Sequence, residues 1–419
     1  MSGAQETIVE ASVARPAARL GPLAVEAPDE DGFSLGVAAA EALPWAPGSA
    51  PTRIDLVGDL PPVAEWALAE ALGIAPVPVH RTPGGSAHLF EALRSRGDAR
   101  PGASRLVIAV DMTRAGGPHE PAHGALGLAV RIGAGPGVRV LQVDSRLSAP
   151  GGDRESSAGF LPKARGPTPA ILIGDDERVA ATARALGDLG YVPAVVPRTP
   201  PGTGPAPTVP FGLALRAAAP TGSGEAPCAL VAVGPDRMVT VELAVSGRIA
   251  WSEAPAAPPR ILSALPPSEG PGAPDARAEG AYVPKPRYLE NLPSRWRLIA
   301  DRCGKCGSWT FPARGSCRNC GAVAPLQPTP LARSGWVVEA CTTVRPGAQP
   351  TEFDPFVLRA GAYDVVIARS PEGPRGTFQV AGPPGSAPVG NTVDLVLRRL
   401  YPMEGEWRYG RKAVVRQAP

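Results

Sequence analysis

Four cysteines with metal-ligand spacing are the sharpest chemical feature of this chain. Cys303, Cys306, Cys317 and Cys320 form a Cys-x2-Cys-x10-Cys-x2-Cys array. Two close pairs on two short turns can converge on one tetrahedral ion, and four thiolates suit zinc. A glycine adjoins each pair, in C-G-K-C-G and C-R-N-C-G, and permits the tight turn that such a knuckle needs. Because four thiolates fill the coordination sphere, the array predicts a structural zinc ion rather than a catalytic one.

The alternative for these cysteines is a pair of disulfides in an oxidising compartment. The first residues, MSGAQETIVEASVARPAARL, contain no apolar core of the kind found in a signal peptide. Beyond the array the chain has just Cys228 and Cys341. We therefore expect a reducing cytoplasm, where this spacing indicates metal binding. No apolar run reaches 18 residues, so we expect no membrane span.

Composition allows two or three domains in a chain of 419 residues. Hydrophobic residues make up 44%, enough for a real core, while 53 prolines and 49 glycines indicate many turns and linkers. The net charge of +3 argues against a strongly basic nucleic-acid surface.

The order of patterns along the chain predicts five parts. Residues 1–19 are expected to be a flexible leader. Residues 20–255 alternate helical and extended patterns, which predicts an α/β layered domain. Residues 256–285 are rich in proline and glycine and indicate a linker. Residues 286–323 contain a short helix leading into the cysteine array, and 324–419 contain about five short strand-like runs. Those runs predict an all-β OB-fold barrel.

Several individual elements can be predicted within the α/β part. Helices are expected at 32–43, 61–74 and 86–97, where apolar residues recur at helical spacing or alanine dominates. Strands are expected at 53–60, 104–112 and 170–174, which are apolar runs of the kind found in buried sheets.

The C-terminal part resembles the zinc-ribbon/OB-fold domain that accompanies thiolases and hydroxymethylglutaryl-CoA synthases in bacteria and archaea. The matching features begin with Trp296 and Arg297, followed by C-G-K-C-G and the F-P-A-R segment at 311–314. The second knuckle, an S-G-W strand opening and a closing Y-G-R-K follow in order. The resemblance covers about 286–416 and implies a zinc ribbon that precedes an OB-fold.

The N-terminal part resembles the thiolase superfamily, closest to hydroxymethylglutaryl-CoA synthase and ketoacyl synthase III. Residues 29–43 resemble that family's first helix, 81–89 its nucleophile turn and helix, and 106–111 the strand that follows. Residues 168–252 match the second half of the fold more weakly. The resemblance implies a layered α/β fold and chemistry on acyl-CoA.

The residues that this chemistry requires are missing. The family's nucleophile turn has a cysteine where this chain has Thr82, in T-P-G-G-S-A. The family's glutamate falls on Leu60, or on Asp59 with a one-residue slip. The family's histidine belongs in the second half, yet the four histidines are His80, His88, His119 and His123. Since a threonine hydroxyl is a weak nucleophile without an activator, we predict no catalytic residue and a degenerate thiolase-like domain.

An enzyme that uses displaced residues is the alternative. Cys228 could be a nucleophile, but its place at the start of an apolar run favours a buried structural thiol. Cys341, within a predicted strand, is interpreted in the same way. His80 and His88 flank the nucleophile turn and are expected to be surface or packing residues rather than a base.

These features predict a non-catalytic accessory or scaffold subunit of a thiolase-type acyl-CoA complex. Its expected partner is a catalytic thiolase or synthase subunit, in a homo- or hetero-oligomer. A basic run supplies candidates for binding the phosphates of CoA, namely Arg398, Arg399, Arg408 and Lys412. Further candidates are Arg411 and Arg416 in the same run and Arg287, Arg295 and Arg297 on the short helix before the array. The alternative for this run is a solvated barrel edge.

Two other functions stay open at this point. The first is an active hydroxymethylglutaryl-CoA synthase-like enzyme or acyltransferase. The second is nucleic-acid binding, because zinc ribbons and OB barrels can stack bases on aromatic side chains. Aromatic residues near the array could serve that purpose, namely Trp296, Trp309, Phe311, Trp336 and Trp407. The near-neutral charge argues against it, so we expect no nucleic acid and no membrane as partners.

Overall fold

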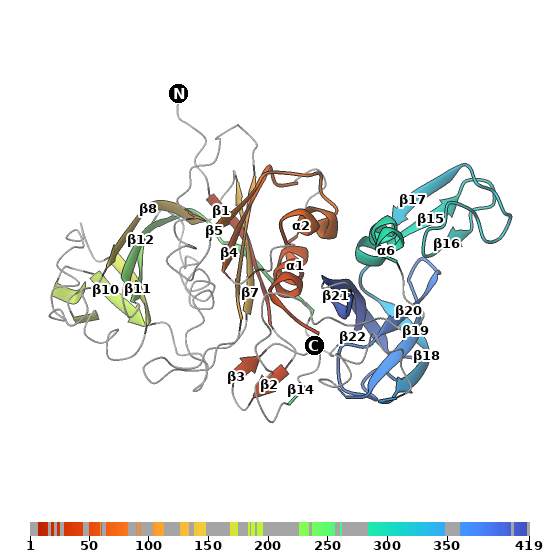
Figure 1. Ribbon diagram of the computed structural model, residues 1–419. Coiled ribbons are helices and arrows are strands. Elements are labelled where there is room, and N and C mark those ends of the chain that lie inside the picture. The colour runs from red at the N-terminus through yellow and green to blue at the C-terminus, as the bar shows by residue number, and fades with distance from the viewer. Residues whose placement is uncertain are drawn as a thin grey trace. The chain divides into compact units, whose positions relative to one another are not determined.

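The computed structural model of this chain divides into two compact units (Figure 1). The first unit comprises residues 1–14, 39–60 and 77–254, and the second comprises 15–38, 61–76 and 255–419. The segments 15–38 and 61–76 group with the C-terminal part of the chain. The predicted domain over 20–255 and its boundary stay predictions.

The structure describes most of the C-terminal part and separate stretches of the remainder. The described residues are 7–15, 18–20, 23–25, 29–44, 50–58, 60, 64–82, 89, 92–93, 104–112, 126–133, 138–147, 168–174, 183–184, 186–188, 191–195, 226–233, 237–255, 260–261, 284–347, 361–403 and 406–416.

An eleven-stranded sheet built from two topologically equivalent halves forms the first unit. The first half contains β1 (Thr7–Ala14), β4 (Arg53–Gly58), β5 (Val79–Thr82), β6 (Arg105–Asp111) and β7 (Leu126–Gly133). The second half contains β8 (Val138–Leu147), β9 (Thr168–Gly174), β10 (Tyr191–Val195), β11 (Ala226–Val233) and β12 (Arg237–Val245). β13 (Ala250–Glu253) is the eleventh strand and pairs with β1.

The two halves share one strand order and one pattern of directions. The five strands of each half are numbered here by their position along the chain. In the sheet, each half has the spatial order third, second, fourth, fifth and first. The second strand runs parallel to the third and fourth, and the fifth runs antiparallel to the fourth and first. β1 and β8 join the halves at the middle of the sheet. The sheet is therefore an internal repeat in topology, although the sequence shows no obvious repeat.

β1 corrects the prediction of a flexible leader over 1–19. The strand is buried apart from the half-buried Val9. Glu10 and Ser12 interrupt its apolar residues, which conceals the strand in the sequence. Arg131 lies opposite Glu10 on β7, and its Nε donates to Glu10 Oε2 at 2.6 Å. Because this buried charge has a partner, a polar-looking segment can occupy the centre of a sheet.

Most elements predicted in the α/β part are confirmed. The helices at 32–43 and 61–74 are α1 (Gly32–Ala42) and α2 (Ala64–Leu72), and the strands at 53–60, 104–112 and 170–174 are β4, β6 and β9. Most of the helix predicted at 86–97 lies outside the described residues. In the second unit, β2 (Ala18–Leu20), β3 (Leu23–Val25) and β14 (Arg260–Ile261) form a small sheet, so part of the predicted linker is extended structure.

Two short helices lead into the ribbon, where one helix was predicted. They are α6 (Lys285–Glu290) and α7 (Leu292–Arg297), each with a proline in its first turn, where the missing amide hydrogen costs little. Their buried side chains, Tyr288 and Trp296, each donate a hydrogen bond to the carbonyl oxygen of Tyr409 at 3.0 Å. Both helices are therefore fixed to the last strand of the chain.

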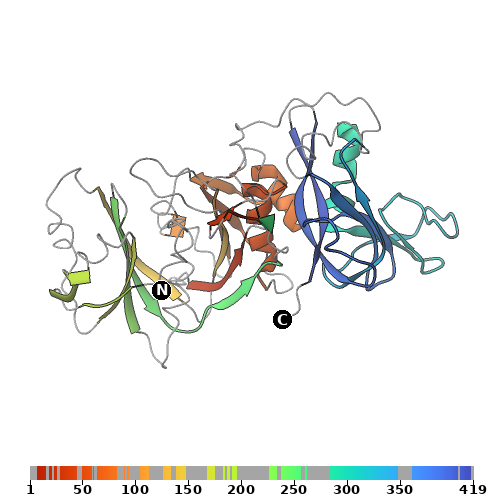
Figure 2. The same cartoon turned by 90° about the horizontal axis from the view of Figure 1, so that it is seen from below.

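The ribbon and the sheet that follows complete the second unit. The ribbon contains β15 (Ile299–Cys303), β16 (Trp309–Thr310) and β17 (Leu326–Pro330), with β15 in the middle. The C-terminal sheet contains β18 (Trp336–Val344), β19 (Tyr363–Arg369), β20 (Arg375–Gln379), β21 (Thr392–Met403) and β22 (Glu406–Val415). Its order is β20-β19-β18-β21-β22, and Figure 2 shows its strong curvature in blue.

The predicted closed barrel is not confirmed. Within the described residues, an isolated parallel bridge between Val380 and Ala413 links the two ends of the C-terminal sheet, rather than a continuous ladder. The concave side holds an apolar core that includes Trp336, Phe378 and Leu395. Among the described residues no helix is long and apolar enough to cross a membrane.

Candidate functional site

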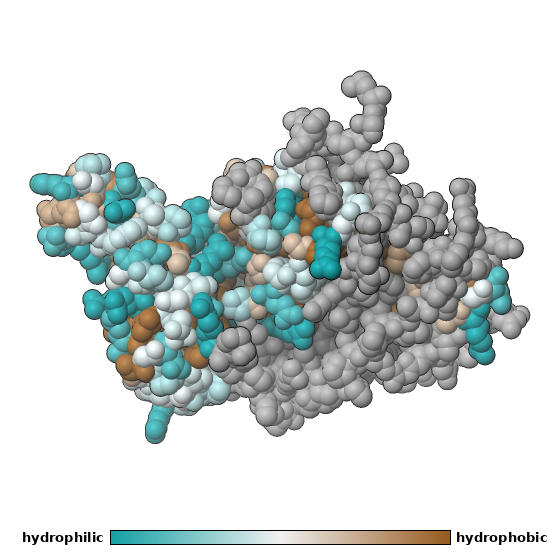
Figure 3. All heavy atoms as spheres, turned by 180° about the vertical axis from the view of Figure 1, so that it is seen from behind, coloured by the Kyte–Doolittle hydropathy of each residue, from teal (hydrophilic) through white to brown (hydrophobic). Residues whose placement is uncertain are grey.

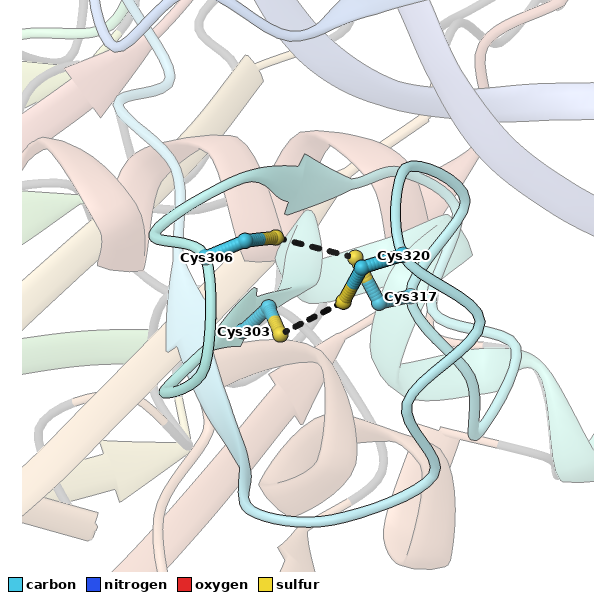
Figure 4. Close-up of side chains that lie close together, drawn as sticks. All are labelled: Cys303, Cys306, Cys317 and Cys320. Carbon is cyan, nitrogen blue, oxygen red and sulfur yellow. Dashed lines mark hydrogen bonds between the residues drawn. The ribbon is translucent and has the colours of Figure 1, made fainter.

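The four predicted zinc ligands converge on one point of the ribbon (Figure 4). Their sulfur atoms all lie within 4.8 Å of one another, with Sγ–Sγ distances of 3.7 Å for Cys303 and Cys320 and 3.5 Å for Cys306 and Cys317. A tetrahedral site with Zn–S bonds of about 2.3 Å has sulfur–sulfur edges of about 3.8 Å. These cysteines are free thiols rather than disulfides. The array thus fits a structural zinc ion with a closed coordination sphere.

The two knuckles that carry the cysteines have the same backbone geometry. Gly307 and Gly321 have φ of 69° and 70°, in the left-handed region that favours glycine. Their amides donate to the carbonyl oxygens of Cys303 and Cys317, at 2.8 and 2.9 Å. The turn that the sequence predicted from the glycine next to each cysteine pair is therefore present twice.

Two side chains hold the loop between the knuckles, and sequence analysis predicted a role for neither. Asp301 Oδ2 accepts hydrogen bonds from the amides of Arg314 and Gly315, at 3.2 and 3.3 Å. Thr310 Oγ1 accepts one from the Arg318 amide at 3.1 Å. Asp301 and Thr310 are both buried, so each bond is shielded from water. They position the second knuckle without contacting the metal site.

The thiols of the array have unequal acidities. Hydrogen bonds from the Ser308 side chain, the Ser308 backbone and Asn319 lower the pKa of Cys306 to about 5. The backbone at Ala322 lowers the pKa of Cys320, but its hydrogen bond with Cys306 and burial outweigh this and raise it to about 11. Bound zinc deprotonates coordinating thiols, so it would remove this asymmetry.

The positions that match the family's nucleophile and glutamate lie close together at one edge of the first unit's sheet. β4 and β5 are adjacent and parallel, with Val57 paired to Thr82, so their carboxyl ends meet. Leu60 follows β4 and is buried. Thr82 ends β5 and is half-buried. Asp59 lies outside the described residues.

The surroundings of this edge include an arginine, an exposed histidine and the buried Asp111, which ends the neighbouring strand β6. Arg81 Nη1 donates to the carbonyl oxygen of Leu60 at 2.7 Å, so its guanidinium braces the turn after β4. His80 is exposed on β5. His88, His119 and His123 lie outside the described residues.

The two cysteines outside the array lack the environment of an activated nucleophile. Cys228 is buried on β11, as predicted, and desolvation raises the pKa of its thiol to about 11. Cys341 on β18 is exposed, which corrects the prediction of a buried thiol. Partial desolvation and the negative charge of Asp364 raise its pKa. A raised pKa lowers the thiolate fraction, so neither thiol is activated.

The four basic residues predicted to bind CoA are buried and paired in the second unit. The exposed fractions of Arg398, Arg399, Arg408 and Lys412 are 1%, 7%, 2% and 0%. Lys412 Nζ lies 2.9 Å from Asp29 Oδ2, and Arg398 Nη2 lies 2.7 Å from Glu30 Oε1. The protein encloses these groups in this arrangement, and CoA binding by the four residues stays a prediction.

The acidic partners of three of these residues come from 29–31, more than 360 positions earlier in the chain. The fourth, Arg408, pairs with Glu406 two positions away, at 2.9 Å. Arg399 Nη2 also donates to the carbonyl oxygen of Glu30 at 2.6 Å, and the Tyr409 hydroxyl donates to Asp31 Oδ2 at 2.6 Å. Together these contacts form a buried ionic cluster that ties the segment before α1 to β21 and β22. Because these opposite charges lie so far apart in the sequence, no local sequence pattern could have predicted the cluster.

The aromatic residues that suggested nucleic-acid binding are not free for stacking as a group. Trp296 and Trp336 are buried, with exposed fractions of 2% and 0%. Trp407 is half-buried, and the Cζ of Arg399 lies 4.5 Å from its ring centroid. A continuous base-stacking platform is therefore not formed by these side chains.

Comparison with known families identifies the ribbon. Residues 294–323 match the family described as "ChsH2, rubredoxin-like zinc ribbon domain". The match begins in α7, spans all four cysteines and ends after the second knuckle. The second unit therefore contains a zinc ribbon of this rubredoxin-like type.

Comparison with solved structures finds proteins of the classes that the N-terminal motifs resemble. An HMG-CoA synthase complexed with CoA is 11% identical, with a TM-score of 0.45, and the match covers 58% of this chain and 83% of that one. A 3-oxoacyl-(acyl carrier protein) synthase III from Pseudomonas aeruginosa is 17% identical, with a TM-score of 0.42, and covers 58% and 99%. The corresponding synthase from Aquifex aeolicus is 13% identical, with a TM-score of 0.42, and covers 57% and 99%.

Proposed function

We propose that this chain is a non-catalytic accessory subunit of a thiolase-type complex that acts on acyl-CoA. The observation that carries the proposal is the edge where β4 and β5 end. There the chain has a buried leucine, Leu60, and a threonine, Thr82, at positions where the resembling family has a glutamate and a cysteine. Leucine cannot transfer a proton, and a threonine hydroxyl needs a base to become nucleophilic.

The remaining cysteines and histidines support the same proposal. Burial raises the pKa of the Cys228 thiol to about 11, which suits a structural residue. The second half of the chain has no histidine, because the last one is His123. The nucleophile and histidine positions thus hold no residue of the required type, while the glutamate position falls on Leu60 or, with a one-residue slip, on Asp59. An enzyme with displaced residues would need to fill them from elsewhere, and no feature of the described residues favours that alternative.

The C-terminal sheet supports a scaffold role through an OB-type arrangement, which we propose for residues 324–419. Its five strands run in the order β20-β19-β18-β21-β22, and the Val380–Ala413 bridge brings the two end strands together. The ribbon precedes this sheet, in the order that the resembling thiolase-associated domain shows. In this proposal the zinc ion stabilises the ribbon and takes no part in the chemistry.

Reconstitution with a catalytic thiolase or synthase subunit tests the proposed function. The chain is co-expressed with a catalytic thiolase-type subunit, and the complex is isolated by size exclusion with mass measurement. We expect a stable complex whose acyl-CoA turnover persists when this chain carries Thr82→Ala or Cys228→Ser. The purified chain alone should show none. Turnover by the chain alone that disappears with either substitution would support the displaced-residue enzyme instead.

A further inference from the structure

A large cleft lies in the C-terminal part of the chain, and arginine is the most frequent polar residue that lines it. The helices α6 and α7, the ribbon loop 311–318 and the strands β19 and β20 contribute its walls, and its volume is about 1480 Å³. Glu290 is the one acidic residue in this lining. The arginines are Arg287, Arg295, Arg314, Arg318, Arg375 and Arg411. The volume exceeds the roughly 300–1,000 Å³ of a common small-molecule site, which suits a long ligand.

Several of these positive charges are available to a ligand. Arg314 and Arg318 are exposed, and neither forms an ion pair with a carboxylate of the described residues. Arg295 is half-buried beside Tyr288, with 5.7 Å between its Cζ and the ring centroid. Its Nε is buried and has no hydrogen-bond acceptor among the described residues. A ligand oxygen at that nitrogen would recover the free energy lost by leaving a buried donor unpaired.

The cleft also has an apolar wall. Leu298, Ile367 and Phe378 contribute to its lining, and Ile367 is 42% exposed although it is a large aliphatic side chain. The ribbon itself presents a mainly hydrophilic surface, visible as the lobe on the left of Figure 3. A ligand suited to this cleft therefore combines anionic groups with an apolar portion.

We propose that this cleft binds a phosphate-bearing ligand of nucleotide size, with Arg295, Arg314 and Arg318 contacting the phosphates. The planar guanidinium fork matches phosphate oxygens in pairs, which favours arginine over lysine for this purpose. Arginines enter from two separate elements, α7 and the ribbon loop, as expected for a walled small-molecule site. The identification of the ligand as a CoA thioester rests on the proposed function, whereas the phosphate site itself does not.

Calorimetric titration of the zinc-loaded full chain tests this site. The probes are CoA, pyrophosphate, pantetheine without phosphates, and a poly-glutamate peptide. Arg314→Ala and Arg318→Ala each remove one charge-assisted contact and should weaken CoA binding by about tenfold or more. Arg369→Ala is the matched control, because Arg369 is an exposed arginine of the same unit that pairs with Glu339 and does not line the cleft. Its effect should stay within about twofold.

The outcomes separate the ligand site from the proposed function. Binding of CoA and pyrophosphate, absent for pantetheine and weakened by the two cleft variants alone, supports the site. Equal affinity for CoA in all variants overturns the site. Binding of poly-glutamate by a chain that binds neither CoA nor pyrophosphate also overturns it, and assigns the cleft to an acidic protein segment. A chain that joins the catalytic subunit without binding phosphates retains the proposed function and loses this site. Arginine-dependent CoA binding without complex formation supports the phosphate site and counts against the proposed function.

Discussion

The buried ion pair between Asp29 and Lys412 allows a quantitative test of how the segment before α1 is fixed to the C-terminal sheet. Lys412 is fully buried, Asp29 is 5% exposed, and their charged atoms lie 2.9 Å apart. Replacing Lys412 by methionine keeps the stem but leaves the carboxylate buried without this partner. Removing one member of a buried pair costs about 3–5 kcal/mol. We expect about 3 kcal/mol, because Arg398 also acts electrostatically on Asp29.

The double variant distinguishes pairing from simple loss of packing. Replacing both partners of a buried pair by uncharged residues is often nearly neutral. The loss of unfolding free energy in the double variant Asp29→Asn/Lys412→Met should therefore be smaller than the sum of the two single losses by about 2 kcal/mol or more. Lys285→Met is the control, because Lys285 pairs with Glu406 at 2.7 Å while both side chains are more than 40% exposed. That exposed pair should contribute about 0–1 kcal/mol.

Hydrogen exchange of the amides in β21 and β22 measures the change locally, which matters because two units do not unfold as one transition. A loss of about 3 kcal/mol corresponds to roughly 150-fold faster exchange. Strictly additive single and double variants, or a Lys285→Met effect as large as that of Lys412→Met, would show that Asp29 and Lys412 do not stabilise this unit as a buried pair.

The same pair predicts a pH dependence whose sign follows from Asp29. Burial raises the pKa of the Asp29 carboxyl, but the positive charges of Lys412 and Arg398 together lower it by more. The pKa therefore lies below the usual 3.8. A depressed carboxyl pKa stabilises the fold above the unfolded pKa and loses that contribution as pH falls. The protection factors of the β22 amides, corrected for the intrinsic pH dependence of exchange, should fall below about pH 4, and Asp29→Asn should flatten this acid response.

Three further predictions concern other parts of the chain. Cys303→Ser should abolish stoichiometric zinc binding and increase exchange across the ribbon, while exchange in the first unit's sheet stays unchanged; unaltered zinc content would contradict the assignment. With zinc bound, iodoacetamide should modify the exposed Cys341 first and reach the buried Cys228 only on unfolding, as peptide mass analysis can show. Gly58→Ala should destabilise the first unit by more than about 2 kcal/mol, because φ is +91° and a Cβ would lie 2.2 Å from the Val110 oxygen; a near-neutral melting temperature would count against this geometry.

Strong local patterns were sufficient to predict many elements. The apolar run at 105–111 gave β6, and the spacing of four cysteines gave the ribbon. Both patterns are local, because a buried strand needs a short run of apolar residues and a knuckle needs a glycine at a fixed offset. The elements and the metal site could therefore be predicted from short windows of sequence.

Features that depend on distant partners could not be predicted in this way. β1 looked like a leader because Glu10 is polar, and its burial depends on Arg131 in β7. The basic run near the C-terminus looked like a surface for phosphates, because the acidic partners of Arg398 and Lys412 lie at 29–31. The cleft combines arginines from helices, ribbon and sheet, whose proximity is a property of the fold. In each case the missing information was a contact between residues far apart in the sequence.

Thioester turnover decides whether this chain contributes a catalytic group to the proposed complex. The measurement is release or consumption of the CoA thiol by the purified chain, by a catalytic thiolase-type subunit with it, and by the complex carrying Thr82→Ala in this chain. We predict no turnover by the chain alone and equal turnover by the complex with and without Thr82→Ala. Turnover by the chain alone, abolished by Thr82→Ala, would show that this chain is itself an enzyme.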